Sequence, residues 1–326
     1  MRGAHAIGQV PSDADLGAGR GRRRDARRRG FPPGEHDGVM PDAPEDLAAL
    51  TGRTVVVTGA SAGIGAAAVR RLHRLGATVV PVGRSPEKTA RIADEIGVAP
   101  ELVDFADLST VHALADRLLA RCPRLDVLVN NAGLSAPTRQ VTGDGHERTF
   151  QVNHLGPFLL TGLLRDRLEQ SAARVVTTSS GASRFGSLDL GDLESARSYR
   201  SMQAYGTSKL ANIVFTRELA RQALGSGLTA TAFHPGWVHT ELGRESPLAG
   251  TVVEKIAYLA AKTPEEGADT LVWLAAAAPD QWRSGGYYVK RREAAVKAQG
   301  SDELLARQFW ARSAELVGLD GAPALR

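Results

Sequence analysis

The chain has 326 residues, 43% of them hydrophobic and 23% charged, which is the composition of a globular protein long enough to bury a large core. A single cysteine excludes an internal disulfide, and scattered histidines without a Cys/His cluster exclude a structural zinc site. No apolar run reaches the length of about 18 residues that a membrane span needs, while the net charge of +4 raises the question of a nucleic-acid partner.

Most of the excess positive charge lies in the first 39 residues, which hold eight arginines and five acidic residues. The rest of the chain carries 32 basic and 31 acidic residues. Because the segment is rich in Gly, Arg, Asp and Pro and has no apolar period, we interpret residues 1–45 as a disordered extension. The arginine run at 21–30 could contact nucleic acid or anionic lipid, but a solvated tail is favoured and no nucleic-acid partner is expected.

The extension also lacks the apolar core of a secretory signal peptide, so we expect a cytoplasmic protein. Met40 directly precedes the point where a folded domain would begin. An alternative is therefore that translation starts at Met40 and the extension is not made. The folded domain is expected to cover residues 46–326.

From Thr51 onward, short β-branched runs alternate with amphipathic stretches. The predicted strands cover residues 54–59, 77–83, 102–105, 126–133, 174–180 and 228–236. The predicted helices cover residues 64–75, 86–96, 110–121, 145–170 and 205–224. This alternation implies right-handed crossovers, so we predict a single doubly wound Rossmann-type α/β domain with a mostly seven-stranded parallel sheet and helices on both faces.

A glycine-rich turn, TGASAGIG, lies between the first predicted strand and the first predicted helix, at residues 58–65. Its spacing is G-x3-G-x-G. Gly59 permits the tight turn, Gly63 lets backbone N–H groups approach a pyrophosphate, and Gly65 permits close helix–strand packing. The helix N-terminus presents its positive end to the phosphates, with Ser61 and Ile64 inside the same turn. Glycines alone are a weak signal, but this placement predicts a dinucleotide site.

The tip of the second predicted strand indicates which dinucleotide binds. An NAD site places a carboxylate there to accept the ribose hydroxyls. Here Gly83 would leave open space, and Arg84 offers a planar cation suited to bidentate contact with a 2′-phosphate. We therefore predict NADP(H) as the cofactor. The alternative is that Arg84 is only a surface residue that ends the strand.

Tyr205 and Lys209 lie four residues apart in YGTSK, on one face of a predicted helix. An ammonium close to a phenol stabilises the phenolate and lowers the phenol pKa from about 10. Tyr205 could then act as a general acid in carbonyl reduction or as a general base in alcohol oxidation. Such a pair on its own is usually coincidence on a solvated helix, so its meaning depends on the surrounding motifs.

Those motifs resemble the short-chain dehydrogenase/reductase family. The similar segments are TGASAGIG at 58–65, NNAG at 130–133, VTTSSGAS at 176–183, YGTSK at 205–209 and HPGWVHTEL at 234–242. They occur in the family's order over residues 51–313. The resemblance implies that Tyr205 is the proton donor or acceptor and that Lys209 lowers its pKa and holds the nicotinamide ribose.

Further roles are implied by the same resemblance. Ser180 would hydrogen-bond the substrate oxygen, with Ser179 as the less favoured candidate. Asn153, in FQVNHLGPFLLT, would help to keep a proton-relay water near the lysine. Contacts with the cofactor are implied for Asn131, Gly133, Asp104 at the adenine, Pro235, Val238 and Thr240 at the carboxamide. No metal site is implied.

A subgroup is indicated by finer features. Ser180 and Tyr205 are 25 residues apart, which is longer than the usual spacing in this family, so an insertion at 184–203 separates them. This insertion and the segments YGTSKLANIVFTRELA, KTPEEGADTLVWLA and LARQFWARSAELVGL resemble retinol dehydrogenases and WW-domain oxidoreductases. Those relatives mostly use NADP(H) and carry an arginine at the position of Arg84. No WW module or apolar anchor precedes residue 51, which argues against partner binding through such a module and against a retinoid substrate.

We therefore predict an NADP(H)-dependent oxidoreductase that acts on a lipophilic aldehyde, ketone or secondary alcohol. Apolar residues at 241–262 have helical spacing and fit either a lid over such a substrate or a helix packed on the body. A catalytically silent NADP(H)-binding regulatory protein is the main alternative, and a sugar-nucleotide epimerase is disfavoured by the glycine spacing. Two copies could pair through the predicted helices at 145–170 and 205–224, or the chain could be monomeric.

Overall fold

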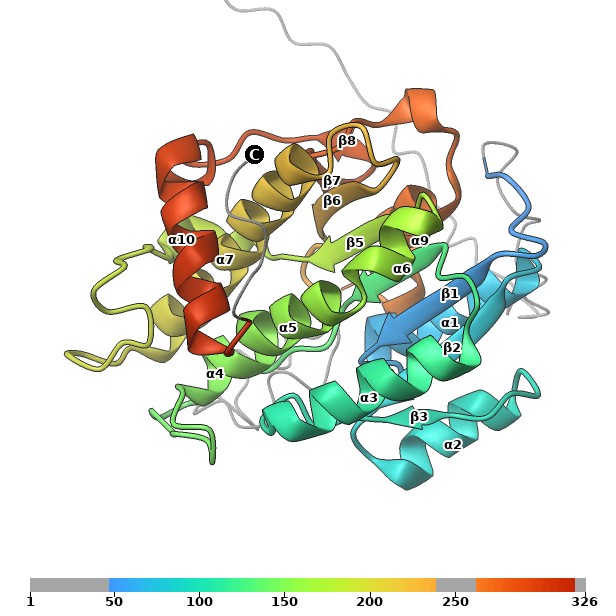
Figure 1. The fold of residues 1–326 in the computed structure, drawn as a ribbon, viewed down its shortest axis with the longest axis horizontal. Helices are drawn as coiled ribbons and strands as arrows, with labels where there is room; N and C mark the ends of the chain where they lie inside the picture. The colour runs from blue at the N-terminus through green and yellow to red at the C-terminus, as the bar shows by residue number, and fades with distance from the viewer. Residues whose placement is uncertain (1–46, 239–261, 320–326) are drawn as a thin grey trace, which may run out of the picture. The chain divides into compact units, whose positions relative to one another are not determined.

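A twisted eight-stranded sheet forms the centre of the computed structural model, which describes residues 47–238 and 262–319 (Figure 1). The strands are β1 (Thr54–Thr58), β2 (Thr78–Gly83), β3 (Glu101–Leu102), β4 (Val127–Asn130), β5 (Arg174–Thr178), β6 (Thr229–His234), β7 (Tyr287–Val289) and β8 (Arg292–Glu293). Their order is β3-β2-β1-β4-β5-β6-β7-β8. Strands β1 to β7 are all parallel to their neighbours, and β8 is antiparallel to β7. The predicted N-terminal extension and most of the predicted lid lie outside the described residues.

Helices cover both faces of the sheet (Figure 1). One face carries α1 (Gly63–Arg74) and α9 (Pro264–Ala276) over one hydrophobic cluster, with α2 (Pro86–Asp94) beside β2. The other carries α3 (Leu108–Arg121), α5 (Gly156–Leu163), α6 (Arg165–Gln170) and α7 (Ser201–Gln222) over a second cluster, with α10 (Glu303–Leu316) packed outside. The predicted doubly wound α/β fold is confirmed, and the seven parallel strands gain one short antiparallel partner.

The strands form because their residues are buried on both faces of the sheet. Val55, Val56 and Val57 in the centre of β1 are fully buried, and β-branched side chains pack well on a pleated surface. The order of the strands reverses direction at β1 and β4, since β2 and β3 lie on one side and β5 to β7 on the other. Ligands of such sheets bind in the crevice at this reversal, outside the carboxyl ends of the strands.

The prediction of one continuous helix at 145–170 is wrong. It is divided into α4 (Arg148–Phe150), the π-helical segment η1 (Gln151–Leu155), α5 and α6. Pro157 has no N–H to donate to the carbonyl of Asn153 four residues earlier, which interrupts the α-helical ladder in this region. The predicted helix at 205–224 begins four residues earlier, at Ser201, so Tyr205 lies in its second turn.

The C-terminal part of the chain completes the fold. Lys290 and Arg291 both have positive φ, as in the two-residue turn of a tight β-hairpin, and they join β7 to β8. Trp310 of α10 packs against Phe158 of α5 and Phe215 of α7, with ring centroids 4.8 Å and 5.7 Å away. Thus α10 covers part of the helices through which pairing of two copies was predicted, and that pairing stays a prediction.

None of the helices in the described part of the chain has the length and apolarity to cross a membrane.

Candidate active site

Tyr205 and Ser180 meet above the carboxyl end of β5. Ser180 precedes the 3-10 helix η2 (Gly181–Phe185), and its side chain lies close enough to the Tyr205 phenol of α7 to influence the pKa of that phenol. The two elements approach closely at a pair of glycines, because a β-carbon on Gly186 would lie 2.3 Å from the Gly206 carbonyl carbon. Burial raises the pKa of the Tyr205 phenol, and the Ser180 side chain opposes this shift. The lowered phenol pKa predicted from the nearby ammonium is therefore not found in the protein alone.

The Lys209 ammonium is buried one turn along α7 from Tyr205. Its Nζ lies 5.7 Å from the centroid of the Tyr205 ring and donates to the carbonyl oxygen of Thr178 at 3.3 Å. Burial lowers the pKa of Lys209 to about 8. Lys209 is therefore mostly protonated at neutral pH and loses its charge as the pH rises through about 8.

Asn153 and Gly133 lie against Lys209. The Asn153 amide donates to the Leu134 carbonyl at 2.8 Å and to Ser208 Oγ at 2.9 Å, and its Oδ1 accepts from the Leu134 N–H at 2.7 Å. A β-carbon on Gly133 would lie 3.1 Å from Asn153 Oδ1. The π-helical segment η1 thereby presents the asparagine side chain to the loop after β4.

Two serines follow β5, and the structure distinguishes them. Ser179 is buried, and its hydroxyl donates to the backbone carbonyl of Lys209 at 2.7 Å. Ser180 accepts from the N–H of Ala182 at 3.1 Å, while Tyr287 donates to the Ser180 carbonyl at 3.4 Å. Ser179 therefore ties β5 to α7, and the hydroxyl of Ser180 is the one that reaches Tyr205.

The glycine-rich turn has the geometry that its sequence predicts. Gly59 and Gly63 have φ of +67° and +54°, in the left-handed region that favours glycine. A β-carbon on Gly65 would lie 2.1 Å from the Gly59 carbonyl oxygen, so the start of α1 and the turn touch through backbone. Ala62 provides no side-chain cap, and Ser61 is half-buried beside it. The first N–H groups of α1 are thus left for a ligand.

Asn131 joins the ends of three neighbouring strands. Its Nδ2 donates to the Thr58 carbonyl at 3.1 Å, and its Oδ1 accepts from Thr178 Oγ1 at 3.2 Å. Thr58 Oγ1 in turn accepts from the N–H groups of Asn131 and Ala132 at 2.9 Å and 3.1 Å. Asn131 therefore ties the carboxyl ends of β1, β4 and β5 together.

Arg84 extends from the tip of β2 beside the glycine turn. The N–H of Ala60 donates to the Val82 carbonyl at 2.9 Å, which joins the turn to the tip. The Arg84 side chain is exposed, and its guanidinium has no hydrogen-bond or ion-pair partner within residues 47–238 and 262–319. The open space predicted at Gly83 is wrong, since a β-carbon there would lie 2.2 Å from Thr89 Oγ1, so the glycine allows α2 to pack on the strand.

The remaining predicted cofactor residues lie around the same crevice. Asp104 follows β3, is half-buried and accepts from the Ala106 N–H at 3.0 Å. Pro235 follows β6. Val238 lies near Ile64, because a β-carbon on Gly267 would lie 2.7 Å from the Val238 side chain and 3.1 Å from the Ile64 side chain. Thr240 lies outside the described residues.

Several residues of the site were not predicted from the sequence. Thr58, Thr178 and Tyr287 hydrogen-bond predicted residues, and Asn212 hydrogen-bonds the Thr178 carbonyl. Asn212 could have been found, because it lies three residues after Lys209 and seven after Tyr205, on the same helix face. Tyr287 could not, since only the strand order brings β7 close to Ser180.

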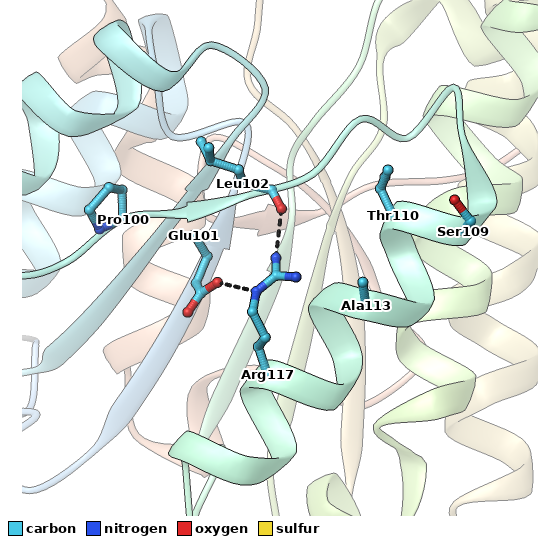
Figure 2. A pocket seen from close by; sticks show the side chains of 7 residues that line it. All are labelled: Pro100, Glu101, Leu102, Ser109, Thr110, Ala113 and Arg117. Atoms are coloured by element: carbon cyan, nitrogen blue, oxygen red, sulfur yellow. Dashed lines mark hydrogen bonds and ion pairs between the residues drawn. The ribbon is translucent and has the colours of Figure 1, made fainter.

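A pocket of about 480 Å³ lies elsewhere, at the edge strand β3. Figure 2 shows Arg117 reaching from α3 to the Glu101 carboxylate at 2.8 Å and to the Leu102 carbonyl at 2.8 Å. Strand β3 is four places from β5 in the sheet. The pocket is lined by none of the predicted catalytic residues. Within the described ranges no group of three metal-ligating side chains occurs.

The chain is similar to proteins of known family. The family model described as short chain dehydrogenase matches residues 53–249. A proposed daunorubicin C-13 ketoreductase of Streptomyces sp. (strain C5) is 44% identical over 82% of this chain and 94% of its own length. Human retinol dehydrogenase 13 is 39% identical over 89% and 92%. A crystal structure of a proposed NAD(P)-dependent gluconate 5-dehydrogenase from Beutenbergia cavernae, with NADP bound at low occupancy, has a TM-score of 0.58 and 31% identity over 70% of this chain and 91% of that one.

Proposed function

The chain belongs to the short-chain dehydrogenase family and is an NAD(P)-dependent oxidoreductase of alcohol or carbonyl groups, and from this premise we propose that it is an NADP(H)-dependent reductase of lipophilic carbonyl compounds. The observation that carries the proposal is the proximity of Tyr205 and Ser180 above the end of β5, with Lys209 Nζ buried 5.7 Å from the Tyr205 ring centroid. We assign catalysis to Tyr205, Ser180, Lys209 and Asn153. A catalytically silent protein is disfavoured because all four side chains are present.

The residues of the crevice fit a dinucleotide. Gly59, Ser61, Gly63, Ile64 and Gly65 form a turn whose uncapped helix N-terminus suits a pyrophosphate. Asn131, Gly133, Tyr205 and Lys209 would hold the nicotinamide ribose end, and Asp104 the adenine. Pro235, Val238 and Thr240 would lie along the nicotinamide. When bound, the dinucleotide supplies or accepts the hydride.

The protein's own residues supply position and a proton. The substrate oxygen would accept hydrogen bonds from Tyr205 and Ser180, which stabilise the negative charge that develops on that oxygen during reduction. Because burial raises the pKa of Tyr205, the phenol is protonated at neutral pH and can donate its proton. The Lys209 ammonium then stabilises the phenolate that is left. This order of events favours reduction at neutral pH.

Asn153 would act through its neighbours. Its side chain already bonds Leu134 and Ser208, so it fixes the loop after β4 against α7 close to Lys209. We propose that this arrangement keeps the relay water of the lysine in place. The proton lost by Tyr205 would be replaced through Lys209 and that water.

The preference for NADP(H) rests on Arg84. An exposed guanidinium beside the glycine turn can bind a 2′-phosphate in a bidentate manner. The Beutenbergia structure with bound NADP is consistent with this choice in a protein of the same fold. Discrimination between NADPH and NADH is the direct test of this part of the proposal.

A lipophilic substrate is supported by apolar side chains near the catalytic pair. Phe185 and Met202 are 61% and 58% exposed, on the two elements that carry Ser180 and Tyr205. The names of two relatives specify a ketone reduction and a retinoid alcohol. The test is oxidation of NADPH with a panel of nonanal, all-trans-retinal, an aromatic ketone and a quinone. Turnover confined to small polar carbonyls such as glyceraldehyde would contradict the proposal.

A further inference from the structure

Asn212 shares a hydrogen-bond acceptor with Lys209. Both side chains are 2% exposed, and they lie one turn apart on α7. Asn212 Nδ2 donates to the Thr178 carbonyl oxygen at 3.1 Å, and Lys209 Nζ donates to the same oxygen at 3.3 Å. The oxygen that receives the buried ammonium is thus also bound by a neutral amide.

The other end of the Asn212 amide faces a buried histidine. Asn212 favours the protonated form of the His154 ring, although burial lowers the pKa of His154 to about 3. Neither Asn212 Oδ1 nor His154 Nδ1 has a hydrogen-bond partner in the part of the chain that the structure describes. Leaving two buried polar atoms unpaired would cost about 1–3 kcal/mol each, and a small movement of the Asn212 amide would let the His154 Nδ1–H donate to Asn212 Oδ1.

The state of His154 follows from its second nitrogen. His154 Nε2 lies 2.9 Å from Ser313 Oγ of α10, and the ring is packed among phenylalanines. Since the ring is neutral, one nitrogen must accept and the other must donate. If Ser313 donates to Nε2, the proton resides on Nδ1 and can be donated to Asn212 Oδ1. The Asn212 amide is then oriented with its NH2 group toward Thr178.

We infer that Asn212 is a positioning residue that, held by His154 and Ser313, fixes the Thr178 carbonyl as the acceptor of the Lys209 ammonium. The inference rests on the proposed catalytic role of Lys209. It also gives α10 a role at the active site, because its Ser313 is the outermost member of the chain of contacts.

Loss of Asn212 should destabilise the charged form of Lys209. A carbonyl that is no longer fixed solvates the ammonium less well, and an apolar replacement makes the surroundings less polar. Tyr205 on α7 and His154 on η1 are the titratable groups that face this cluster. Among the described residues no charged side chain offsets the burial of Lys209. The pKa of Lys209 should therefore fall.

The decisive measurement is a titration of Lys209 itself in the full-length protein. The chain has six lysines, so the side chains labelled with carbon-13 give few NMR signals, and a Lys209→Met variant assigns the one of interest. No substrate or cofactor is needed. In Asn212→Leu the pKa of Lys209 should be about half a unit or more below its value in the unaltered protein, with the other five lysines unchanged.

Two further variants test whether the change in the Lys209 pKa is specific to Asn212 and its partners. Thr216→Val is the matched control, because Thr216 is buried one turn further along α7 and its hydroxyl bonds only the Asn212 backbone carbonyl. It should leave the pKa of Lys209 unchanged. The double variant His154→Phe with Ser313→Ala replaces both partners by apolar groups inside an aromatic cluster, which need not destabilise the fold. It should shift the pKa in the same direction as Asn212→Leu.

If Asn212→Leu does not fold, the double variant decides. An unchanged or raised pKa of Lys209 in the folded variants would overturn the inference. The pH dependence of NADPH oxidation should move with the titration, and kcat at pH 8 should fall about twofold or more, while the Kd of NADPH changes by less than about twofold. If the unaltered protein reduces no carbonyl of the panel, the proposed function fails, and the NMR titration still decides the role of Asn212.

Discussion

Gly133 and Lys209 fit against each other so closely that a β-carbon on Gly133 would lie 3.2 Å from Lys209 Nζ. The lysine cannot easily move away, because its ammonium bonds the Thr178 carbonyl in a buried place. Asn153 limits the space on the other side, since its Oδ1 would lie 3.1 Å from the same β-carbon. The absence of a side chain at Gly133 therefore sets where the ammonium lies relative to Tyr205.

Gly133→Ala should lower kcat about tenfold, because the methyl group forces Lys209 Nζ to move by a few tenths of an ångström. Steady-state kinetics of NADPH oxidation measure the effect. The control is Gly143→Ala, in the same connection between β4 and α4, where an added β-carbon meets no atom within 4 Å. Equal activity of the two variants would contradict the tight fit described above.

Arg84→Ala should weaken NADPH binding about 10- to 100-fold and leave NADH binding within about twofold, since only NADPH carries the 2′-phosphate. Fluorescence titration of each nucleotide measures both constants. Arg91→Ala provides a matched loss of one exposed arginine on α2 and should change neither. An equal loss of affinity for both nucleotides on removal of Arg84 would refute the assignment of the phosphate site.

Carbonyl reduction should be fastest below about pH 8, which is the pKa of Lys209. As the pH rises through this value the ammonium is lost, the Tyr205 phenolate is less well stabilised, and the rate at pH 9 should be about a tenth of the plateau. Alcohol oxidation should increase with pH instead, because the raised pKa of Tyr205 keeps the phenol protonated near neutrality. Initial rates between pH 6 and 10 test both directions.

The control for this profile is His146→Gln, since the pKa of His146 is raised above its ordinary value of 6.5. The descending limb of the reduction rate should stay in place in that variant. A limb that disappears with His146 would mean that Lys209 is not the group that controls the rate.

His146 makes a separate prediction about stability. Its Nδ1 lies 2.7 Å from Glu194 Oε1, and its Nε2 lies 3.0 Å from the Leu316 carbonyl, which joins the insertion to the end of α10. Glu194 raises the pKa of His146 above its ordinary value of 6.5. The protonated histidine thus adds stability that is complete below pH 6.5 and is lost as the pH rises through the raised pKa.

His146→Gln should therefore destabilise the protein at pH 6 by about 1 kcal/mol, and by clearly less at pH 9. Urea unfolding at the two pH values measures the difference. The same difference at both values would show that the charge of His146 contributes nothing and that only packing is lost.

The sequence predicts the fold and the reactive groups of the site because their signals are local. The glycine turn, the pair Tyr205 and Lys209, and Ser180 each lie at the end of a strand or on a helix face that the hydrophobic pattern already predicts. Strand order then brings them together, since the carboxyl ends of parallel strands share one edge of the sheet. Their spacing along the chain was therefore sufficient to predict that they meet.

The supporting groups could not be predicted in this way. The contacts of Thr178 and Asn131 join residues 47 positions apart, and those of His154 and Ser313 join residues 159 apart. The interruption at Gln151–Leu155 depends on a π-helical register that no apolar period reveals. The raised pKa of Tyr205 arises from burial, which outweighs the opposing effect of the Ser180 side chain.

In the proposed mechanism Tyr205 donates the proton in carbonyl reduction. The most direct measurement is kcat for NADPH oxidation by Tyr205→Phe, together with the Kd of NADPH. The variant keeps the ring and loses only the hydroxyl, so kcat should fall at least about a hundredfold while the Kd stays within about threefold. A Tyr205→Phe protein that retains kcat within about tenfold of the unaltered chain would contradict the assignment of Tyr205 as the general acid.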